Sequence, residues 1–398
     1  MKFSLPSWDR RTWVVGFGIT LGNVAQSAVP WIVGGLMRSE GYEINRAGLM
    51  ITAEVMTMGV LMLVTARFVH KIPRRAALFS GVGLAVAAQI ASCFVHDFGT
   101  LALIRAASGL GFGLVYAVAS AIGAGATAPP KTFAAAGIIV LLLGTLINPA
   151  LGYGLEHRGA EGVFLGVAAL CCVMVVPLAA LTARPLEDTG AGAREYPALD
   201  LTRVVAAAGN VLTMALMSAA VCGLYVFLEG IAHRSGISPT TLGGGMSAVS
   251  LLGASGGLLA MVLSRRFGEI RPLVIGMPVM GALLLMMTRV WTPWAFWLIF
   301  VGITATYWCL YPFIFGLAGR IDPGGRAAAA TGSGKILLAS GGAALAGFLG
   351  HAYGVEAYGF AALVICLCAT GSAAAVGHLT RRIGQRDPDD TPACGEIA

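Results

Sequence analysis

Charged residues are scarce in this sequence. Of its 398 residues, 11% are Asp, Glu, Lys or Arg and 57% are hydrophobic, whereas soluble domains carry about 25% charged residues. A soluble fold could not keep this much apolar surface away from water. The apolar residues form blocks of about 20, the length at which a helix crosses a hydrocarbon core of roughly 30 Å. The lipid bilayer is therefore the expected surrounding of most of this chain.

The sequence also lacks the residue groupings that metal, disulfide and nucleotide sites need. Seven of the eight cysteines lie in apolar blocks, without metal-ligand or disulfide spacing. Thr331–Lys335 resembles part of a phosphate loop, but Ala329 replaces its first glycine and Ile336 follows the lysine. No span carries paired Asp or His groups or a Ser/His arrangement of the kind an intramembrane enzyme would use. We expect no cofactor, no metal and no enzymatic activity.

The apolar blocks predict an all-α integral membrane protein with twelve spans. These lie near residues 13–37, 47–69, 76–95, 99–123, 132–154, 162–183, 204–231, 241–264, 272–288, 293–318, 327–350 and 356–379. Nineteen of the 26 Lys and Arg fall in connections on one side, five on the other and two inside spans. Because Lys and Arg favour the cytoplasmic side, we expect a multi-pass protein of the cell (inner) membrane with both termini in the cytoplasm. The net charge of +7 is spread over these connections, so it does not indicate nucleic-acid binding.

The chain divides near its midpoint into two similar halves. A shift of 195 residues superposes Gly35 on Gly230, Gly41 on Gly236, Gly48 on Gly243, Lys71 on Arg266, Tyr116 on Tyr311, Gly159 on Gly354 and Glu161 on Glu356. This constant shift indicates an internal duplication, with substrate expected between the halves near the midplane. The predicted organisation is a six-helix bundle over 1–183, a linker over 184–203, a second six-helix bundle over 204–380 and a cytoplasmic tail over 381–398.

Several motifs resemble those of the major facilitator superfamily, and the likeness covers nearly the whole chain. Arg67–Arg75 is similar to the basic loop that follows the second helix of that family, and Leu263–Arg271 is its counterpart in the second half. His70 and Arg265 stand where the family usually has Asp, and Pro73 replaces a Gly.

Two further motifs lie in the fourth and fifth spans. Arg105–Gly113 is similar to the Arg-x-x-x-Gly-x-Gly-x-Gly signature of the family, and Gly144–Gly152 resembles a degraded form of the Gly-Pro motif in the fifth helix of its antiporters. The resemblance implies two six-helix bundles that rock around a central site, with gating residues in these motifs. The gating candidates are His70, Lys71, Arg74, Arg75, Arg265, Arg266, Gly144, Asn148, Pro149 and Gly152.

Glu54 and Arg105 are ionisable residues deep inside expected spans. Glu54 lies about seven residues, or roughly 10 Å, inside the outer end of the second span, and Arg105 lies at a similar depth in the fourth. An ionised side chain in hydrocarbon costs roughly 2.5–3.5 kcal/mol, so each should face a partner, water or the bundle interior. We expect the two to interact, with Glu54 either exchanging a proton or belonging to a permanent structural ion pair. Burial in a low-dielectric cavity would favour the neutral, protonated form of the Glu54 carboxyl, whereas the positive charge of Arg105 would favour its charged form.

Polar and aromatic side chains inside the spans are the substrate-binding candidates. Lys335, in the eleventh span, either attracts an anionic group of the substrate or extends toward the cytoplasmic interface. Asn23 and Gln26 share one face of the first span, where they line a substrate path or bond a neighbouring helix. Glu229, close to the outer end of the seventh span, is expected to reach the headgroup region. The aromatic candidates, which are also typical of packing or interfacial anchors, are Tyr116, Tyr307, Trp308 and Tyr311.

These features predict a secondary active transporter driven by the proton gradient. Its expected partners are a small organic substrate, the proton and the lipid bilayer, and Arg105 and Lys335 favour an organic acid. The alternative is a proton-antiport efflux pump for drugs or amphiphilic metabolites, which the motif around Pro149 favours. We expect a monomer.

Overall fold

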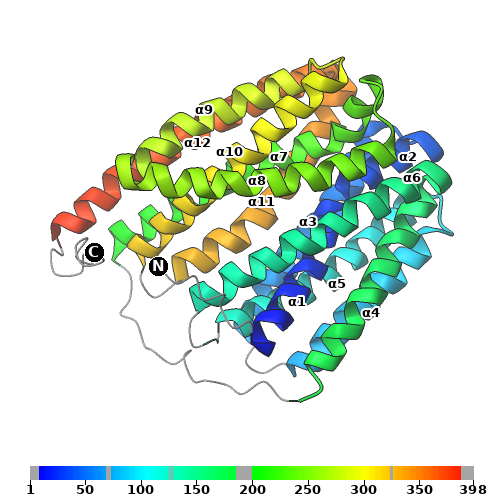
Figure 1. Ribbon diagram of the computed structural model, residues 1–398, viewed down its shortest axis with the longest axis horizontal. Coiled ribbons are helices and arrows are strands. Elements are labelled where there is room, and N and C mark those ends of the chain that lie inside the picture. The colour runs from blue at the N-terminus through cyan, green and yellow to red at the C-terminus, as the bar shows by residue number, and fades with distance from the viewer. Residues whose placement is uncertain are drawn as a thin grey trace.

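The computed structural model describes residues 9–68, 73–124, 126, 129–184, 200–322 and 326–386, and every regular element in these ranges is a helix. The helices, labelled in Figure 1, are α1 (Arg10–Ser27), α2 (Val29–Ser39), α3 (Ile44–Phe68), α4 (Arg74–Ser92), α5 (Phe98–Ala124), α6 (Pro129–Leu181), α7 (Leu201–Arg234), α8 (Pro239–Phe267), α9 (Ile270–Met287), α10 (Pro293–Ile321), α11 (Arg326–Tyr353) and α12 (Val355–Arg386). Within the described residues, ten helices are long and apolar enough to cross a membrane. The all-α membrane fold predicted from the sequence is confirmed.

Local sequence signals set several helix starts. Asp97 and Asp200 precede α5 and α7, and their carboxylates accept hydrogen bonds from the backbone N–H groups of Thr100 and Arg203, both at 2.9 Å. Such caps satisfy donors that have no partner inside the helix, and the bonds from Thr100 lower the pKa of Asp97. Pro293 stands in the first turn of α10, where its missing N–H costs nothing.

The first predicted span is interrupted in the structure, and the fifth and sixth are fused. The helix is interrupted between α1 and α2, next to Pro30. Proline breaks a helix because it has no N–H and its ring clashes with the carbonyl four residues earlier. The first predicted span is therefore α1 and α2 together. The 53 residues of α6 hold the fifth and sixth predicted spans, which are joined at Gly159 with φ 59° and ψ −141°. With α6 taken as two arms and α1–α2 as one span, the described helices give the twelve predicted crossings.

The internal duplication is visible in the backbone. Gly41 and Gly236 are 195 residues apart, as are Gly159 and Gly354, and all four have positive φ, between 59° and 85°. A residue with a side chain would cost roughly 1–2 kcal/mol in this conformation. The starts of α3 and α8, and those of α5 and α10, are also 195 residues apart. The two halves therefore repeat both their helices and their tight turns.

The helices form two bundles, α1 to α6 and α7 to α12, which meet through α2 with α7, α3 with α11 and α6 with α8. We call the end of the molecule where α1 begins and α12 finishes the proximal end, and the opposite end the distal end. Figure 1 shows the helices of the two bundles drawn together at the distal end and diverging toward the proximal end.

Equivalent contacts join the bundles on both sides of the molecule. Thr52 Oγ1 on α3 donates to the carbonyl of Ser340 on α11 at 3.2 Å, and Ser247 Oγ on α8 donates to the carbonyl of Thr145 on α6 at 2.8 Å. Both donors and both acceptors are 195 residues apart. The contact between the bundles is thus duplicated like the bundles themselves.

Glycines bring the helices close at these contacts. A Cβ at Gly48 would lie 3.1 Å from the Cα of Gly347, and one at Gly243 would lie 2.5 Å from the carbonyl oxygen of Asn148. These positions belong to the distal halves of their helices. A Cβ at Gly137 or Gly332, in the proximal halves of α6 and α11, would meet nothing within 4 Å. The close contacts between the bundles thus extend from the distal end along α3 and α11 to Gly59, where a Cβ would lie 2.8 Å from the Cα of Leu337, and the bundles diverge toward the proximal end (Figure 1).

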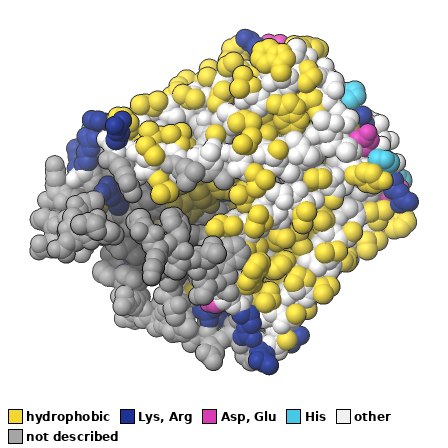
Figure 2. All heavy atoms as spheres, in the orientation of Figure 1, with side chains coloured by type: hydrophobic (Ala, Val, Ile, Leu, Met, Phe, Trp, Pro, Cys, Tyr) yellow, Lys and Arg dark blue, Asp and Glu magenta, His cyan; other side chains and the backbone are white. Residues whose placement is uncertain are grey.

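The molecular surface matches a membrane setting. Figure 2 shows apolar side chains over the middle of the visible face and charged side chains gathered at its two ends. Many large apolar side chains are exposed, such as Leu103 at 73% and Val173 at 68%. Because lipid tails cover such groups without the cost that water imposes, this surface fits a hydrocarbon surrounding.

Candidate functional site

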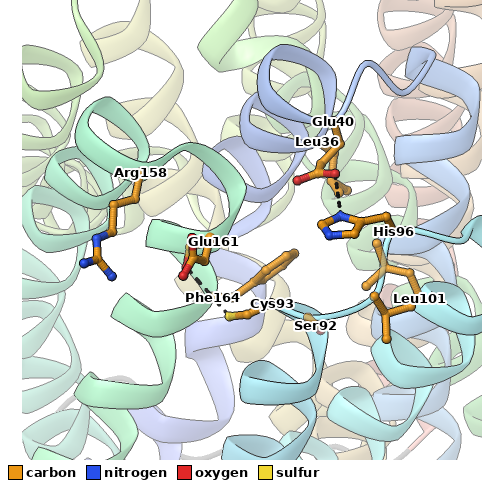
Figure 3. A pocket seen from close by; sticks show the side chains of 10 residues that line it. Leu36, Glu40, Ser92, Cys93, His96, Leu101, Arg158, Glu161 and Phe164 are labelled. Atoms are coloured by element: carbon orange, nitrogen blue, oxygen red, sulfur yellow. Dashed lines mark hydrogen bonds and ion pairs between the residues drawn. The ribbon is translucent and has the colours of Figure 1, made fainter.

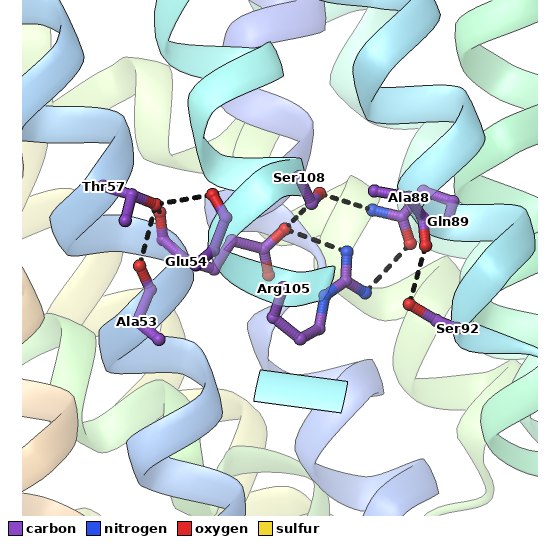
Figure 4. Close-up of polar contacts among 9 residues, drawn as sticks. Ala53, Glu54, Thr57, Ala88, Gln89, Ser92, Arg105 and Ser108 are labelled. Atoms are coloured by element: carbon purple, nitrogen blue, oxygen red, sulfur yellow. Dashed lines mark hydrogen bonds and ion pairs between the residues drawn. The ribbon is translucent and has the colours of Figure 1, made fainter. Parts of the chain in front are cut away.

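A polar network lies inside the N-terminal bundle, among α3, α4 and α5 (Figure 4). The Arg105 guanidinium donates to Glu54 Oε1 at 3.1 Å and to Gln89 Oε1 at 3.0 Å. Ser108 Oγ donates to Glu54 Oε1 at 2.7 Å, and Gln89 Nε2 donates to Ser108 Oγ at 3.1 Å. The four side chains form a closed ring of hydrogen bonds. The structure brings together Glu54 and Arg105, the two residues expected to interact.

This network is sealed from solvent. Glu54 is 1% exposed, and Arg105, Gln89 and Ser108 are each 0% exposed. The guanidinium carbon of Arg105 lies 5.1 Å from the centroid of the Phe164 ring on α6. Arg105 Nε has no hydrogen-bond partner among the described residues, although a buried donor without a partner costs about 1–3 kcal/mol.

Gln89 and Ser108 were not singled out from the sequence. A signal for them exists, because Ser108 follows Arg105 by three residues and so shares its helical face. Gln89 is a polar amide inside an apolar span, where such groups are expected to find partners on neighbouring helices.

The duplication places apolar residues at the same four positions of the C-terminal bundle. The equivalents of Glu54, Gln89, Arg105 and Ser108 under the shift of 195 residues are Val249, Leu284, Phe300 and Ile303. All four of these side chains are buried, with exposures from 0% to 4%. The fold therefore does not require charge or hydrogen bonding at this location.

A second group of candidates meets around Lys335 of α11. Its Nζ lies 5.9 Å from the ring centroid of Tyr307 and 5.4 Å from that of Tyr311, both on α10. The ammonium also interacts electrostatically with the Tyr116 hydroxyl on α5, in the other bundle. No carboxylate lies within ion-pair distance of Lys335 among the described residues. A half-buried cation thus stands among tyrosine rings, facing both bundles.

The other substrate-binding candidates are placed differently. Trp308 contacts the rings of Tyr307 and Tyr311, is 39% exposed, and lies beside Gly253 of α8. Asn23 and Gln26 are half-buried on α1.

The comparison with protein families decides the classification. A model of the Major Facilitator Superfamily matches residues 12–347. The chain belongs to this superfamily. Membership indicates a secondary transporter rather than an enzyme, and confirms the resemblance read from the sequence motifs.

Solved transporter structures share the fold. A bacterial homologue of the human lysosomal transporter Spinster, in an inward-facing and occupied conformation, matches with a TM-score of 0.72 and 14% identity over 94% of this chain and 98% of that chain. A point mutant of the peptide transporter POT, in complex with sulfate, matches with a TM-score of 0.69 and 14% identity over 93% and 94%. A point mutant of the nucleoside transporter NupG gives 0.63 and 11% over 94% and 100%. A comparison with curated proteins finds no match.

In this major facilitator superfamily member, the span-five motif lies where α6 meets α8. Trp31 Nε1 donates to Asn148 Oδ1 at 3.4 Å, and a Cβ on Gly243 of α8 would lie 3.0 Å from the Cα of Pro149. A Cβ at Gly152 would lie 2.4 Å from a backbone oxygen of α8. Gly144, at the proximal side of the motif, has nothing within 4 Å of the place of a Cβ. Three of the four motif residues therefore belong to the distal contact between the bundles.

The basic gating candidates lie at the proximal end. His70 and Lys71 fall outside the described residues, and of Arg265 the backbone alone is described, within α8. Arg74 opens α4, and Arg75 places its guanidinium carbon 5.8 Å from the Phe79 ring. Arg266 is exposed near the end of α8. None of these contacts joins the two bundles.

Glu229 lies in a different setting from the one expected. Its carboxylate is buried, with the residue 4% exposed, and it pairs with Arg38 of α2 at 2.5 Å. The sequence suggested that Glu229 reaches the headgroup region; the structure buries its carboxylate inside the protein, because Gly34 leaves room for the side chain between α2 and α7. A Cβ at Gly34 would lie 2.7 Å from the Glu229 carboxylate. This ion pair joins the bundles at the distal end.

Proposed function

We propose that this protein carries a small organic anion across the cell membrane by alternating access, with the substrate held between the bundles at Lys335. The observation that carries the proposal is the Lys335 ammonium, which stands among Tyr307, Tyr311 and Tyr116 with no carboxylate partner in the described part of the chain. Such an ammonium attracts an anionic group, and hydrogen bonds to charged groups contribute about 1.5–3 kcal/mol. The tyrosine rings favour a substrate that also has apolar or aromatic surface.

Alternating access is supported by the distribution of contacts between the bundles. The distal closure involves glycine contacts at Gly48 and Gly243, whereas the two bundles diverge toward the proximal end (Figure 1). Lys335 lies nine residues from the proximal start of α11, so a substrate held there is released proximally in this conformation. Rocking of the bundles would exchange the closed end for the open one.

We propose that the coupling ion is a proton and that Glu54 exchanges it. The second bundle fills the equivalent positions with Val249, Leu284, Phe300 and Ile303, so the pair between Glu54 and Arg105 is not a requirement of the fold. Buried ion pairs contribute little to stability compared with apolar residues of similar volume, which favours a functional reason for this one. One charge moved across the membrane gains about 2.3 kcal/mol per 100 mV, enough to accumulate a substrate.

The distribution of basic residues favours one orientation of the protein in the membrane. We propose that the proximal end faces the cytoplasm, that both termini lie there, and that the protein functions as a monomer in the inner membrane. The two bundles then correspond to 1–183 and 204–380, joined by a cytoplasmic linker over 184–203 and followed by a tail over 381–398.

An efflux pump that exchanges drugs or amphiphilic metabolites for protons is the second candidate. The position of Asn148, Pro149 and Gly152 at the contact between α6 and α8 favours it, because the motif they resemble belongs to antiporters. The direction of proton movement relative to substrate separates the two candidates.

The test is proton movement in proteoliposomes that enclose a pH dye, with organic acids and amphiphilic drugs added in turn. We expect an aromatic carboxylate such as benzoate to cause proton movement that Glu54→Gln abolishes and Lys335→Met weakens. Glu356→Gln is the matched control, because Glu356 is an exposed carboxylate that pairs with Arg289 at the surface. Transport without a proton signal would contradict the coupling, and an equal response in Lys335→Met would contradict the substrate site.

A further inference from the structure

A cavity opens at the distal end of the N-terminal bundle, apart from the contact between the bundles. It measures about 280 Å³ and lies among α2, α4, α5 and α6. Figure 3 shows Glu40 and His96 on one side, paired at 2.8 Å, and Glu161 on the other. Arg158, also at the rim, extends away from them in this view. The rim is thus lined by charged or titratable side chains that are exposed or, at Glu40, half-buried.

The floor of this cavity is one side chain away from the buried network. Phe164 lines the cavity and is 2% exposed, and the guanidinium of Arg105 lies against its ring. Ser92 and Cys93, at the end of α4, line the floor beside Phe164, and the Cys93 thiol interacts electrostatically with both Arg105 and Glu161. A single layer of side chains therefore separates the cavity from Arg105 and Glu54.

On the buried side of this layer, the Arg105 guanidinium has one N–H donor without a hydrogen-bond partner among the described residues. Its Nη1 and Nη2 bond to Gln89 and Glu54, while its buried Nε bonds to none of the described residues. A buried polar network that is only partly satisfied is costly. Water that passes Phe164 would meet the Arg105 guanidinium, whose Nε could bond to it, and the same guanidinium is bonded to the carboxylate of Glu54.

We propose that this cavity is a proton route from the distal side to Glu54, gated by Phe164 and separate from the path of the substrate. The substrate path runs between the bundles past Lys335, whereas the proton route stays within the N-terminal bundle. Beyond the rim groups already named, the ionisable groups that face the route are Cys93, whose thiol is not required to carry the proton, and Arg105 and Glu54. The proposal rests on the proton exchange at Glu54 proposed above.

The native cysteines provide the test. One variant keeps Cys93 and has the other seven of the eight cysteines replaced by alanine; a matched variant keeps Cys222, which interacts electrostatically with Lys335. Each is placed in nanodiscs and treated with the bulky cationic thiol reagent 2-(trimethylammonium)ethyl methanethiosulfonate, or with small methyl methanethiosulfonate as the control for loss of the thiol. The readout is the rate at which the Glu54 carboxyl changes protonation after a pH jump, followed by infrared difference spectroscopy and assigned by its loss in Glu54→Gln.

We expect the bulky reagent on Cys93 to slow proton exchange at Glu54 at least tenfold, and the small reagent to leave it unchanged. Treatment of the variant that keeps Cys222 should also leave the rate unchanged, because this buried thiol on α7 belongs to the C-terminal bundle and does not line the cavity. Phe164→Ala should raise the rate at least tenfold, and Phe164→Leu provides a second variant that keeps an apolar core.

Two results would overturn the route. The first is an unchanged rate after the bulky reagent has modified Cys93, together with unchanged rates in both Phe164 variants; the second is slowing by modification of Cys222. If Glu54→Gln still abolishes substrate-driven proton movement in proteoliposomes, the route alone is wrong. If the Glu54 carboxyl shows no change of protonation in any protein, both the route and the coupling are wrong.

Discussion

The duplicated fold allows the buried network to be replaced by the residues that the protein itself uses at the equivalent positions. The substitutions Glu54→Val, Gln89→Leu, Arg105→Phe and Ser108→Ile would give the N-terminal bundle the apolar side chains of the C-terminal bundle. We predict that the quadruple variant folds and enters the membrane, and that it loses substrate-driven proton movement. Arg105→Phe alone should be much less stable.

The magnitudes follow from the burial of the four side chains, none of which is more than 1% exposed. Arg105→Phe leaves the Glu54 carboxylate buried without its cation, and breaking a buried pair in this way costs about 3–5 kcal/mol. Replacing the whole pair by apolar residues is often neutral or stabilising by about 1–4 kcal/mol. The quadruple variant should therefore exceed the single variant in stability by at least about 3 kcal/mol.

Equilibrium unfolding in mixed micelles of dodecyl maltoside and SDS, followed by tryptophan fluorescence, measures this difference. The pH-dye assay in proteoliposomes measures coupling in the same preparations. A quadruple variant as unstable as Arg105→Phe would show that the N-terminal bundle needs its network for folding. A quadruple variant that still moves protons with substrate would show that the network has no part in coupling.

Three further substitutions test separate parts of the structure. Lys335→Met should weaken binding of an anionic substrate at least tenfold, because a charge-assisted hydrogen bond contributes about 1.5–3 kcal/mol. Lys335→Arg should retain part of the binding affinity. Equilibrium binding of the labelled substrate measures the affinity of both variants. Gly243→Val should keep the distal end from closing, since even a Cβ would lie 2.5 Å from a backbone oxygen of α6, so a cysteine placed in the central path should react faster with thiol reagents added distally. Gly159→Ala should cost at least about 1–2 kcal/mol of unfolding free energy, because of its positive φ and because a Cβ would lie 1.9 Å from Ser39 Oγ. Gly341→Ala, in a helix with open space around the Cβ position, should cost nothing.

Hydrophobic length and motif spacing were sufficient to predict the helices, the halves and the pair between Glu54 and Arg105. The constant shift also superposes Gly41 on Gly236, and both have positive φ, because turns of this kind select glycine in both copies. Most span boundaries agree with the helices to within a few residues. Span boundaries and tight turns depend on residues that are close together in the chain, so they can be predicted from the sequence alone.

Other parts of the site depend on which helices come into contact, and these contacts could not be predicted from the sequence. Gln89 joins the network because α4 packs against α5. Glu229 is buried because a glycine on α2 gives it space and Arg38 gives it a charge partner. The distal cavity has the same origin, since Glu40, His96 and Glu161 come from segments far apart in the chain.

The distal closure combines duplicated contacts with one contact that is not duplicated. The hydrogen bonds of Thr52 and Ser247 occur once on each side of the molecule, and each contributes about 0.5–1.5 kcal/mol. Two such bonds and close glycine contacts stabilise the closed end by an amount that a bound substrate or proton can offset, since states a few kcal/mol apart both remain populated. The pair between Arg38 and Glu229 has no equivalent in the other half of the contact, because the shift places Gly34 and His233 there. Its loss should therefore shift the balance between the two states in one direction, toward opening at the distal end, without disturbing the packing that makes closure possible.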